Sequence, residues 1–331
     1  MNTYLLKLSA KLHMQPPTLR LLTGFVAVLI VLSVVGWLAS KLASPEGRMA
    51  QALPQLNRHV RGMWSIVVVF SVAMLTGGLG SILVFAGCSF LLLREFITIT
   101  PTRRADQRAL FWAFFAILPL QYIILAYNWY GLFAIFIPVY AFLFVPIRIA
   151  AREDSERFLE RTAKIQWGLM ICVYCVSHAP ALLKLTVPGQ AGAGARLLLF
   201  LCIIVEANGA IHEFVDPLFG RHPVTHKPGN SRTIEGLVAG VMVSAALGLV
   251  MARFTPLTAF QATVIAVLVA LLGSAGQLYL TMIRAERGRD GVVVVHRSNE
   301  MLARTMSLCF AAPIFFHIVR FTLGAGDLQG F

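Results

Sequence analysis

The feature that most constrains this chain is a series of uncharged apolar runs, most of them near the length of a bilayer crossing. A helix needs about 20 apolar residues to span the hydrocarbon core, because it rises about 1.5 Å per residue. Such runs lie at about 21–41, 64–76, 80–97, 109–127, 129–147, 166–184, 196–211, 234–252, 257–283 and 302–322. The pattern predicts an all-α, polytopic integral membrane protein with about nine or ten transmembrane helices.

Composition agrees with this class, since only 13% of the 331 residues are charged, against about 25% in soluble proteins. The run at 21–41 is longer than a signal-peptide core, so we expect it to be retained, whether or not it crosses the membrane. A glycine-rich break at 77–80 separates the short second run from the third. The alternative there is a single long kinked helix over 63–93.

Basic residues alternate sharply between two sets of connections, and this alternation predicts the orientation. The connections 41–62, 94–108, 148–165, 212–233 and 284–304 hold 21 Lys and Arg, whereas the intervening ones hold three. The positive-inside bias places the first set in the cytoplasm, and the expected location is a bacterial inner membrane. Topology thus accounts for the net charge of +13, and nucleic acid is not an expected partner.

The most polar stretch runs over 206–240, between two apolar runs. Hydrocarbon cannot satisfy the backbone hydrogen-bonding groups of a loop, so this stretch must face water or line a cavity. Within it, Arg232 and Thr233 open a helix, where free N–H groups and the helix dipole favour an anion such as a phosphate. The alternative is that Arg221, Lys227 and Arg232 only set the topology and Thr233 only caps the helix.

A second polar loop at 284–304 mixes bases with the acids Glu286, Asp290 and Glu300. Carboxylates near a membrane surface can hold Mg²⁺ that is bound to substrate phosphates. Alternating charge is equally typical of any solvated loop, so this signal alone is weak. Further candidate metal ligands are the histidines of the first loop, His212, His222 and His226.

The two loops carry short motifs in a fixed order: Asn208-Gly209, Gly220-Arg221, Gly229–Gly236, Gly276-Gln277, Arg284–Glu286, Arg289-Asp290, Ser298–Glu300, Ala303–Ser307 and Phe310–Phe316. This order resembles the phosphatidate cytidylyltransferase (CDP-diacylglycerol synthase) family. That family has an Asn-Asp pair, a Gly-Arg or Gly-Lys pair, a Ser-Pro-x-Lys-Thr-x-Glu-Gly helix start and a late Asp-Arg-x-Asp-Ser motif. An early segment, Leu93–Phe96, is similar to the family's Glu-aromatic element.

The resemblance implies a reaction in which a phosphatidate oxygen attacks the α-phosphorus of CTP and expels pyrophosphate, with Mg²⁺ as the cofactor of an active member. It implies catalytic roles for Arg232, Asp290 and Arg304. The residues that it implies for substrate binding are Asn208, Arg221, Lys227, Thr233, Glu235, Arg284 and Arg289.

Several acids of the family pattern are replaced in this chain. Gly209 and Gln277 stand at two Asp positions, and Ala303 and Met306 replace both acids of the Asp-Arg-x-Asp motif. Neutral residues are poor replacements for carboxylates that hold metal ions against developing charge. The surviving residues are mostly cationic, so the pattern also fits a pocket that holds an anionic headgroup without catalysis.

A rebuilt metal site is the alternative, and it would use Glu206, Glu286 and Asp290. Glu206 lies three residues before Gly209, which is close to one helical turn, so its side chain can approach the same space.

The expected organisation has three parts. They are an N-terminal apolar helix with a cytoplasmic linker at 1–62, membrane helices at 63–195, and a cytidylyltransferase-like domain at 196–331 whose polar loops are 206–236 and 284–304.

Three functions remain open from the sequence. The first is an active cytidylyltransferase of phospholipid biosynthesis. The second is an inactive family member that binds an anionic phospholipid such as phosphatidic acid, or a lipid-synthesis partner enzyme. A transporter is less favoured, because Glu206 and Arg196 are expected towards helix ends rather than in the middle of a span. A homodimer is a further expected partner arrangement.

Overall fold

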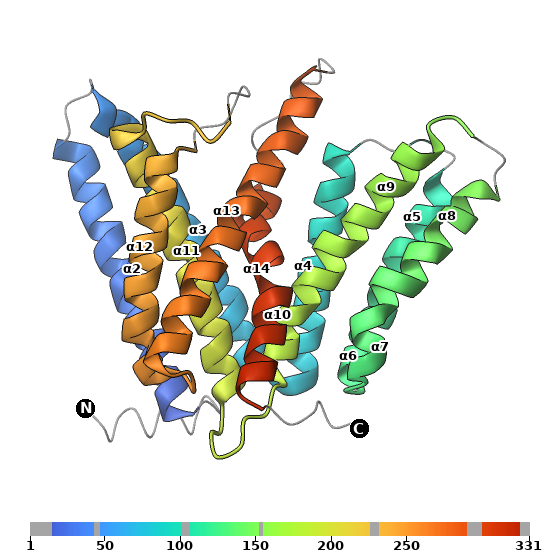
Figure 1. The fold of residues 1–331 in the computed structure, drawn as a ribbon, viewed down its shortest axis with the longest axis horizontal. Coiled ribbons are helices and arrows are strands. Elements are labelled where there is room, and N and C mark those ends of the chain that lie inside the picture. The colour runs from blue at the N-terminus through green and yellow to red at the C-terminus, as the bar shows by residue number, and fades with distance from the viewer. Residues whose placement is uncertain are drawn as a thin grey trace.

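The computed structural model describes residues 15–42, 47–100, 103, 106–151, 155–225, 232–289 and 300–324. Ten helical stretches in these parts are long and apolar enough to cross a membrane. The only extended pairing among the described residues is an isolated bridge between Pro223 and Thr233. The predicted all-α, polytopic membrane class is therefore confirmed (Figure 1).

Seven of these stretches are single helices: α2 (Pro16–Leu42), α3 (Arg48–Leu75), α4 (Gly77–Ile99), α11 (Ala193–Phe219), α12 (Ile234–Met251), α13 (Ala259–Arg289) and α14 (Glu300–Thr322). The other three combine two α-helices through a π-helical turn. They are α5 (Gln107–Trp112) with α6 (Leu118–Ala126), α7 (Tyr130–Ile135) with α8 (Phe142–Ala150), and α9 (Phe158–Leu169) with α10 (Val176–Leu183). A short 3₁₀ turn, Ala252–Phe254, follows α12.

The second and third apolar runs form two helices, α3 and α4, rather than one long kinked helix. Gly77 has a φ of 72°, a left-handed conformation that glycine adopts without steric cost. The helix before this break begins at Arg48 and not near residue 64. The segment 48–62, which we expected in a loop, is therefore the first half of α3, and it buries Leu53 and Val60.

The helix α11 lies at the centre of the packing. In its most apolar window 72% of the residues are buried, against 28% in α2 and in α12. A helix that is apolar on all sides is stable when other helices surround it. It contacts α2, α3, α10, α12, α13 and α14, so polar groups on α11 meet several helices at once.

The helices give the bundle two distinct ends. The C-terminal end of α11, the N-terminus of α12 and the C-terminal end of α13 lie at one of them, which we name the site end (Figure 1). The connection from α6 to α7 and the C-terminal end of α14 lie at the other, which we name the opposite end (Figure 1).

Candidate functional site

A buried carboxylate organises the α11–α12 part of the site. The Oδ1 atom of Asp216 accepts hydrogen bonds from the Thr233 hydroxyl at 2.7 Å and the Thr233 backbone N–H at 3.2 Å. The Oδ2 atom lies 3.1 Å from Nδ1 of His212 and 3.7 Å from the Arg232 guanidinium. Asp216 is 7% exposed, so these partners compensate a charge that would otherwise be costly to bury.

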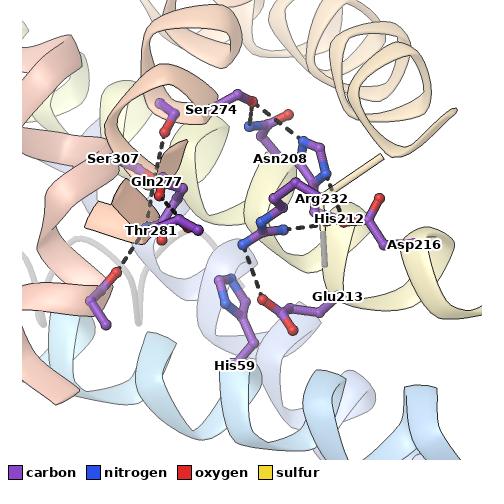
Figure 2. A network of polar contacts seen from close by, with 12 residues as sticks. His59, Asn208, His212, Glu213, Asp216, Arg232, Ser274, Gln277, Thr281 and Ser307 are labelled. Carbon is purple, nitrogen blue, oxygen red and sulfur yellow. Dashed lines mark hydrogen bonds and ion pairs between the residues drawn. The ribbon is translucent and has the colours of Figure 1, made fainter. Parts of the chain in front are cut away.

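The hydrogen bonds around Asp216 continue along α11 to α13. Because a carboxylate only accepts, Nδ1 of His212 donates to Asp216. The His212 Nε2 atom lies 3.3 Å from the Ser274 hydroxyl, and Ser274 accepts from the Asn208 amide at 3.1 Å. Figure 2 shows this chain from Asn208 through Ser274 and His212 to Asp216. It connects α11 to α13 and ends at the first residues of α12.

Arg232 and Thr233 are both held in place at the start of α12. Thr233 caps the helix, since its hydroxyl accepts from the Gly236 N–H at 3.2 Å. Arg232 donates to Glu213 at 3.1 Å (Figure 2). The predicted helix start is present. The hydroxyl of its capping residue, Thr233, donates to Asp216 and accepts from the Gly236 backbone N–H. The side chain of Arg232 is the cation placed beside it.

Glu235 holds the loop that follows α11. Its Oε2 atom accepts from the backbone N–H groups of Arg221 and His222, both at 3.2 Å, and its Oε1 atom pairs with Nδ1 of His222 at 2.6 Å. The Arg221 side chain is exposed. In this geometry Glu235 is a positioning residue for Arg221.

Polar side chains of α11 pack against the small residues of α12. A Cβ atom at residue 236 would lie 1.9 Å from Oδ1 of Asp216, and one at residue 240 would lie 2.3 Å from Oδ1 of Asn208. Real Cβ atoms do not come so close, so a side chain at either position would displace the head group of Asp216 or Asn208. The close packing at these glycines therefore serves the polar network directly.

A histidine of α3 lies over Gly209. A Cβ atom at residue 209 would lie 2.6 Å from Cε1 of His59. The Nε2 atom of His59 lies 3.2 Å from the Glu206 carboxylate and 3.0 Å from the Glu206 carbonyl oxygen. Both partners are acceptors, so Nε2 carries a proton. The imidazole of His59, which is paired with Glu206, therefore fills the space beside Gly209, the position where the family has an aspartate.

The length of α11 corrects one expectation about Glu206. The helix α11 continues to Phe219, so Glu206 lies in the middle of a span and not near its end. Its side chain is 6% exposed and is paired with His59. A paired, buried acid between two helices is what the membrane interior tolerates.

The contacts of Gln277 and Ser307 between α13 and α14 are neutral hydrogen bonds. The Gln277 amide donates to the Ala303 carbonyl oxygen at 2.7 Å and to the Ser307 hydroxyl at 3.0 Å. Ser307 in turn donates to the Gly273 carbonyl oxygen at 2.9 Å (Figure 2). Gln277 and Ala303, which both replace acids of the family pattern, are thus in contact with each other and join α13 to α14.

One face of α3 touches both parts of the site. His59 and Gly62 are three residues apart and share a helix face. A Cβ atom at residue 62 would lie 3.1–3.2 Å from the guanidinium of Arg304. Arg304 on α14 and the His59–Glu206 pair therefore meet the same stretch of α3. Nearby on α4, Glu95 accepts a hydrogen bond from the Leu302 N–H at 3.2 Å, at the start of α14.

The carboxylates near the candidate site are the groups that could hold Mg²⁺ bound to substrate phosphates. No three His, Cys, Asp or Glu side chains among the described residues gather as metal ligands. Each carboxylate of α11 already faces protein cations or donors: Glu206 faces His59, Glu213 faces Arg232, and Asp216 faces three groups. In this structure the three carboxylates of α11 therefore all make contacts within the protein.

The other predicted site residues are placed as follows. Arg284 and Glu286 are exposed near the end of α13. The backbone of Arg289 ends that helix, and its side chain lies outside the described part. Lys227 and Asp290 also lie outside the described residues, as does His226, so the predicted metal set of Glu206, Glu286 and Asp290 stays a prediction.

Sequence reasoning missed His59 and Gly62 as site residues. They lie in a segment whose bases suggested a cytoplasmic linker. The available signal was the apolar spacing of Leu53, Val60 and Met63, which marks a helix face that packs inward.

Comparison with known proteins agrees with this layout. The model of the cytidylyltransferase family matches residues 57–322, from within α3 to the end of α14. A protein of Escherichia coli (strain K12), described as the uncharacterized protein YnbB, is 30% identical over 269 residues, which cover 81% of this chain and 88% of that relative. The chain therefore belongs to the cytidylyltransferase family, the family of the CDP-diacylglycerol synthases.

Proposed function

We propose that this protein is a membrane-embedded cytidylyltransferase of phospholipid biosynthesis, which converts CTP and phosphatidate into CDP-diacylglycerol and pyrophosphate. In this reaction a phosphatidate oxygen forms a bond to the α-phosphorus of CTP. The bond from that phosphorus to the bridging oxygen breaks, and pyrophosphate leaves with the electron pair. Family membership over 57–322 supports the reaction class, and the lipid and the nucleotide are proposals.

The observation that carries the proposal is the fixed position of Arg232 at the N-terminus of α12. The start of a helix favours an anion, because free N–H groups and the helix dipole both point towards it. Arg232 is aligned there by Glu213 and Asp216, and Arg304 meets the same face of α3 as the His59–Glu206 pair. Guanidinium groups bind phosphate oxygens in a two-pronged geometry.

The proposed orientation places the site end in the cytoplasm, in a bacterial inner membrane. The basic connections gather on that side, and CTP is soluble there. The lipid phosphate would reach the site from the membrane and the nucleotide from the water.

The carboxylates of α11 favour a second candidate function. Glu206, Glu213 and Asp216 are all engaged by protein groups, and two acid positions of the family are filled by Gly209 and Gln277. A site of this kind can hold an anionic phospholipid headgroup without transferring a nucleotide. The protein would then bind phosphatidate, or a lipid-synthesis enzyme that carries it.

One assay separates the two candidates. The full chain, purified in mild detergent, receives phosphatidic acid and labelled CTP with Mg²⁺, with Mn²⁺, or with EDTA. Arg232→Gln and Asp290→Asn are run beside it, with Arg232→Lys to retain the charge. The matched control is Arg253→Gln, because Arg253 is exposed in the turn after α12, at the opposite end of the bundle.

We expect labelled CDP-lipid from the wild type and from Arg253→Gln, and loss of product in Arg232→Gln and Asp290→Asn. A wild type without product would overturn the enzyme. If phosphatidic acid then still raises the melting temperature by binding the folded state, and Arg232→Gln abolishes that rise, the lipid-binding function stands. If the wild type forms no product and phosphatidic acid does not raise its melting temperature, both proposed functions are contradicted.

A further inference from the structure

A cavity with several polar groups lies at the opposite end of the bundle, away from the candidate site. It has a volume of about 400 Å³ and is lined by Tyr130, His317, Arg320 and Phe321. Tyr130 begins α7, and the other three residues belong to the last turns of α14. The proposed cytidylyltransferase reaction uses none of these residues.

The lining residues are held in a defined arrangement. The guanidinium carbon of Arg320 lies 3.5 Å from the centroid of the Tyr130 ring, which is a close cation–π contact. The Tyr130 hydroxyl lies 3.1 Å from Nδ1 of His317. His317 and Arg320 are three residues apart, so α14 presents both on the same face. The cation is therefore oriented by the ring beneath it.

A buried histidine continues the polar arrangement behind His317. The ring centroid of His178, on α10, is 5.5 Å from that of His317, and His178 is fully buried. Its Nδ1 atom lies 2.8 Å from the Tyr174 carbonyl oxygen, which only accepts, so Nδ1 carries the proton. Its Nε2 atom has no hydrogen-bond partner in the part of the chain that the structure describes. Unused buried hydrogen-bonding capacity is rare and needs an explanation.

The surroundings of the cavity favour an amphiphile over a free ion. Phe321 is 88% exposed and Ile314 is 40% exposed, and both belong to the helix that carries Arg320 in its last turn. Exposed apolar side chains beside a fixed cation match the acyl chains and the headgroup of a lipid. An arginine that only anchored the helix end would reach towards the headgroups along its own apolar stem, and it would not need a tyrosine ring stacked against its guanidinium.

We propose that this cavity binds the phosphate headgroup of an anionic phospholipid, in the membrane leaflet opposite the candidate active site. Arg320 faces the phosphate oxygens with its planar guanidinium, and the Tyr130–His317 pair offers additional hydrogen bonds. The acyl chains lie along Phe321.

The test is a lipid titration followed by thermal unfolding. The purified full chain is titrated with phosphatidylglycerol, with phosphatidylcholine of the same acyl chains, and with inorganic phosphate. All measurements are made in the Arg232→Gln background, so that anion binding at the site end contributes less to the measured rise in melting temperature. The variants added to it are Arg320→Gln, Arg320→Lys and Tyr130→Phe, with Arg253→Gln as the control, since Arg253 is an exposed arginine at the same end of the bundle.

We expect phosphatidylglycerol to raise the melting temperature more than phosphatidylcholine does. Arg320→Gln should weaken the apparent affinity by about ten- to hundredfold, as the loss of a charge-assisted hydrogen bond predicts. Arg320→Lys, which retains the charge, should keep part of the affinity, and Arg253→Gln should keep all of it.

Three results would overturn the proposal. In the first, Arg320→Gln and its parent bind phosphatidylglycerol equally well. In the second, Arg253→Gln loses as much affinity as Arg320→Gln, so that general surface charge explains the binding. In the third, inorganic phosphate reproduces the Arg320-dependent rise, which assigns the cavity to the free ion. Because the parent already lacks Arg232, each of these results is independent of the cytidylyltransferase proposal.

Discussion

The α11–α12 part of the site and its α13–α14 part each have a neutral residue, Gly209 and Gln277, at an acid position of the family pattern. The surrounding side chains differ between the two parts. Around α11, the position of the lost aspartate is closed by His59, and acids on neighbouring turns are paired with cations or donors. Between α13 and α14, an amide and a hydroxyl join the helices without any charge. The first part pairs buried charges with cations or donors, whereas Gln277 and Ser307 link α13 and α14 through neutral hydrogen bonds.

The difference has an energetic consequence. Removing one partner of a buried ion pair leaves an uncompensated charge, which costs far more than the pair itself contributed. Removing one partner of a neutral hydrogen bond between membrane helices costs about 0.6 kcal/mol on average and about 1.7 kcal/mol at most. We therefore expect substitutions around α11 to be severe and those between α13 and α14 to be mild.

The largest effect is expected for Asp216→Ala. It removes the acceptor of Thr233 and His212 and leaves Arg232 beside a cavity. The predicted loss of stability is about 3–5 kcal/mol, as for other broken buried charge networks. Thermal unfolding of the purified protein measures it.

Asp216→Asn provides the matched control for this change. It retains one acceptor oxygen and removes the charge, so its loss should be smaller than that of Asp216→Ala. Equal losses in the two variants would mean that packing, and not charge compensation, governs this part of the site.

The next effect concerns the His59–Glu206 pair. We expect His59→Ala and Glu206→Gln to destabilise the protein singly, and the double variant to lose less than the sum of the two. The expected coupling is about 0.5–3 kcal/mol, the range for residues in direct contact. A double-mutant cycle by thermal unfolding measures it, and additive losses would show that the contact contributes nothing.

A smaller effect is expected between α13 and α14. Gln277→Leu removes the two hydrogen bonds to Ala303 and Ser307 and should cost about 1 kcal/mol, within the range for helix pairs in membranes. Ser307 keeps its own bond to the Gly273 carbonyl oxygen, which limits the damage. A loss as large as that of Asp216→Ala would remove the contrast between the two parts.

The sequence predicted the features that depend on local pattern. Apolar runs located the ten spans, because the bilayer selects for length and hydropathy alone. The polar stretch located the start of α12, and Thr233 and Glu235 do hold the turn before it, whereas α11 continues to Phe219, past the expected end of its apolar run at 211. The family motifs are themselves local in sequence, so the family was recognisable too.

The features that were missed depend on contacts between distant segments. His59 and Glu206 are 147 residues apart, and no spacing rule brings them together. The bases of 48–62 indicated a loop, although a helix can carry such residues at the membrane surface. The engagement of every carboxylate of α11 was equally invisible, because it requires α3 and the start of α12 to pack against that helix.

The smallest effect on stability is expected at Gly62, where α3 meets the other part of the site. An alanine there places its Cβ atom 3.1–3.2 Å from the guanidinium of Arg304, so Arg304 must move by a few tenths of an ångström. Alanine is favoured over glycine in a helix by up to about 1 kcal/mol, which offsets the crowding and leaves the melting temperature nearly unchanged. Lipid or nucleotide binding at the site end should weaken, because Arg304 is displaced.

Gly24→Ala is the control for Gly62→Ala, since residue 24 lies on a helix and a Cβ atom there meets nothing within 4 Å. Binding is measured by the shift in melting temperature with phosphatidic acid. If Gly62→Ala binds like the control, the position of Arg304 against α3 does not matter for binding, and α3 does not couple the two parts. If it binds more weakly at unchanged stability, the α11–α12 and α13–α14 parts act as one site across the shared face of α3.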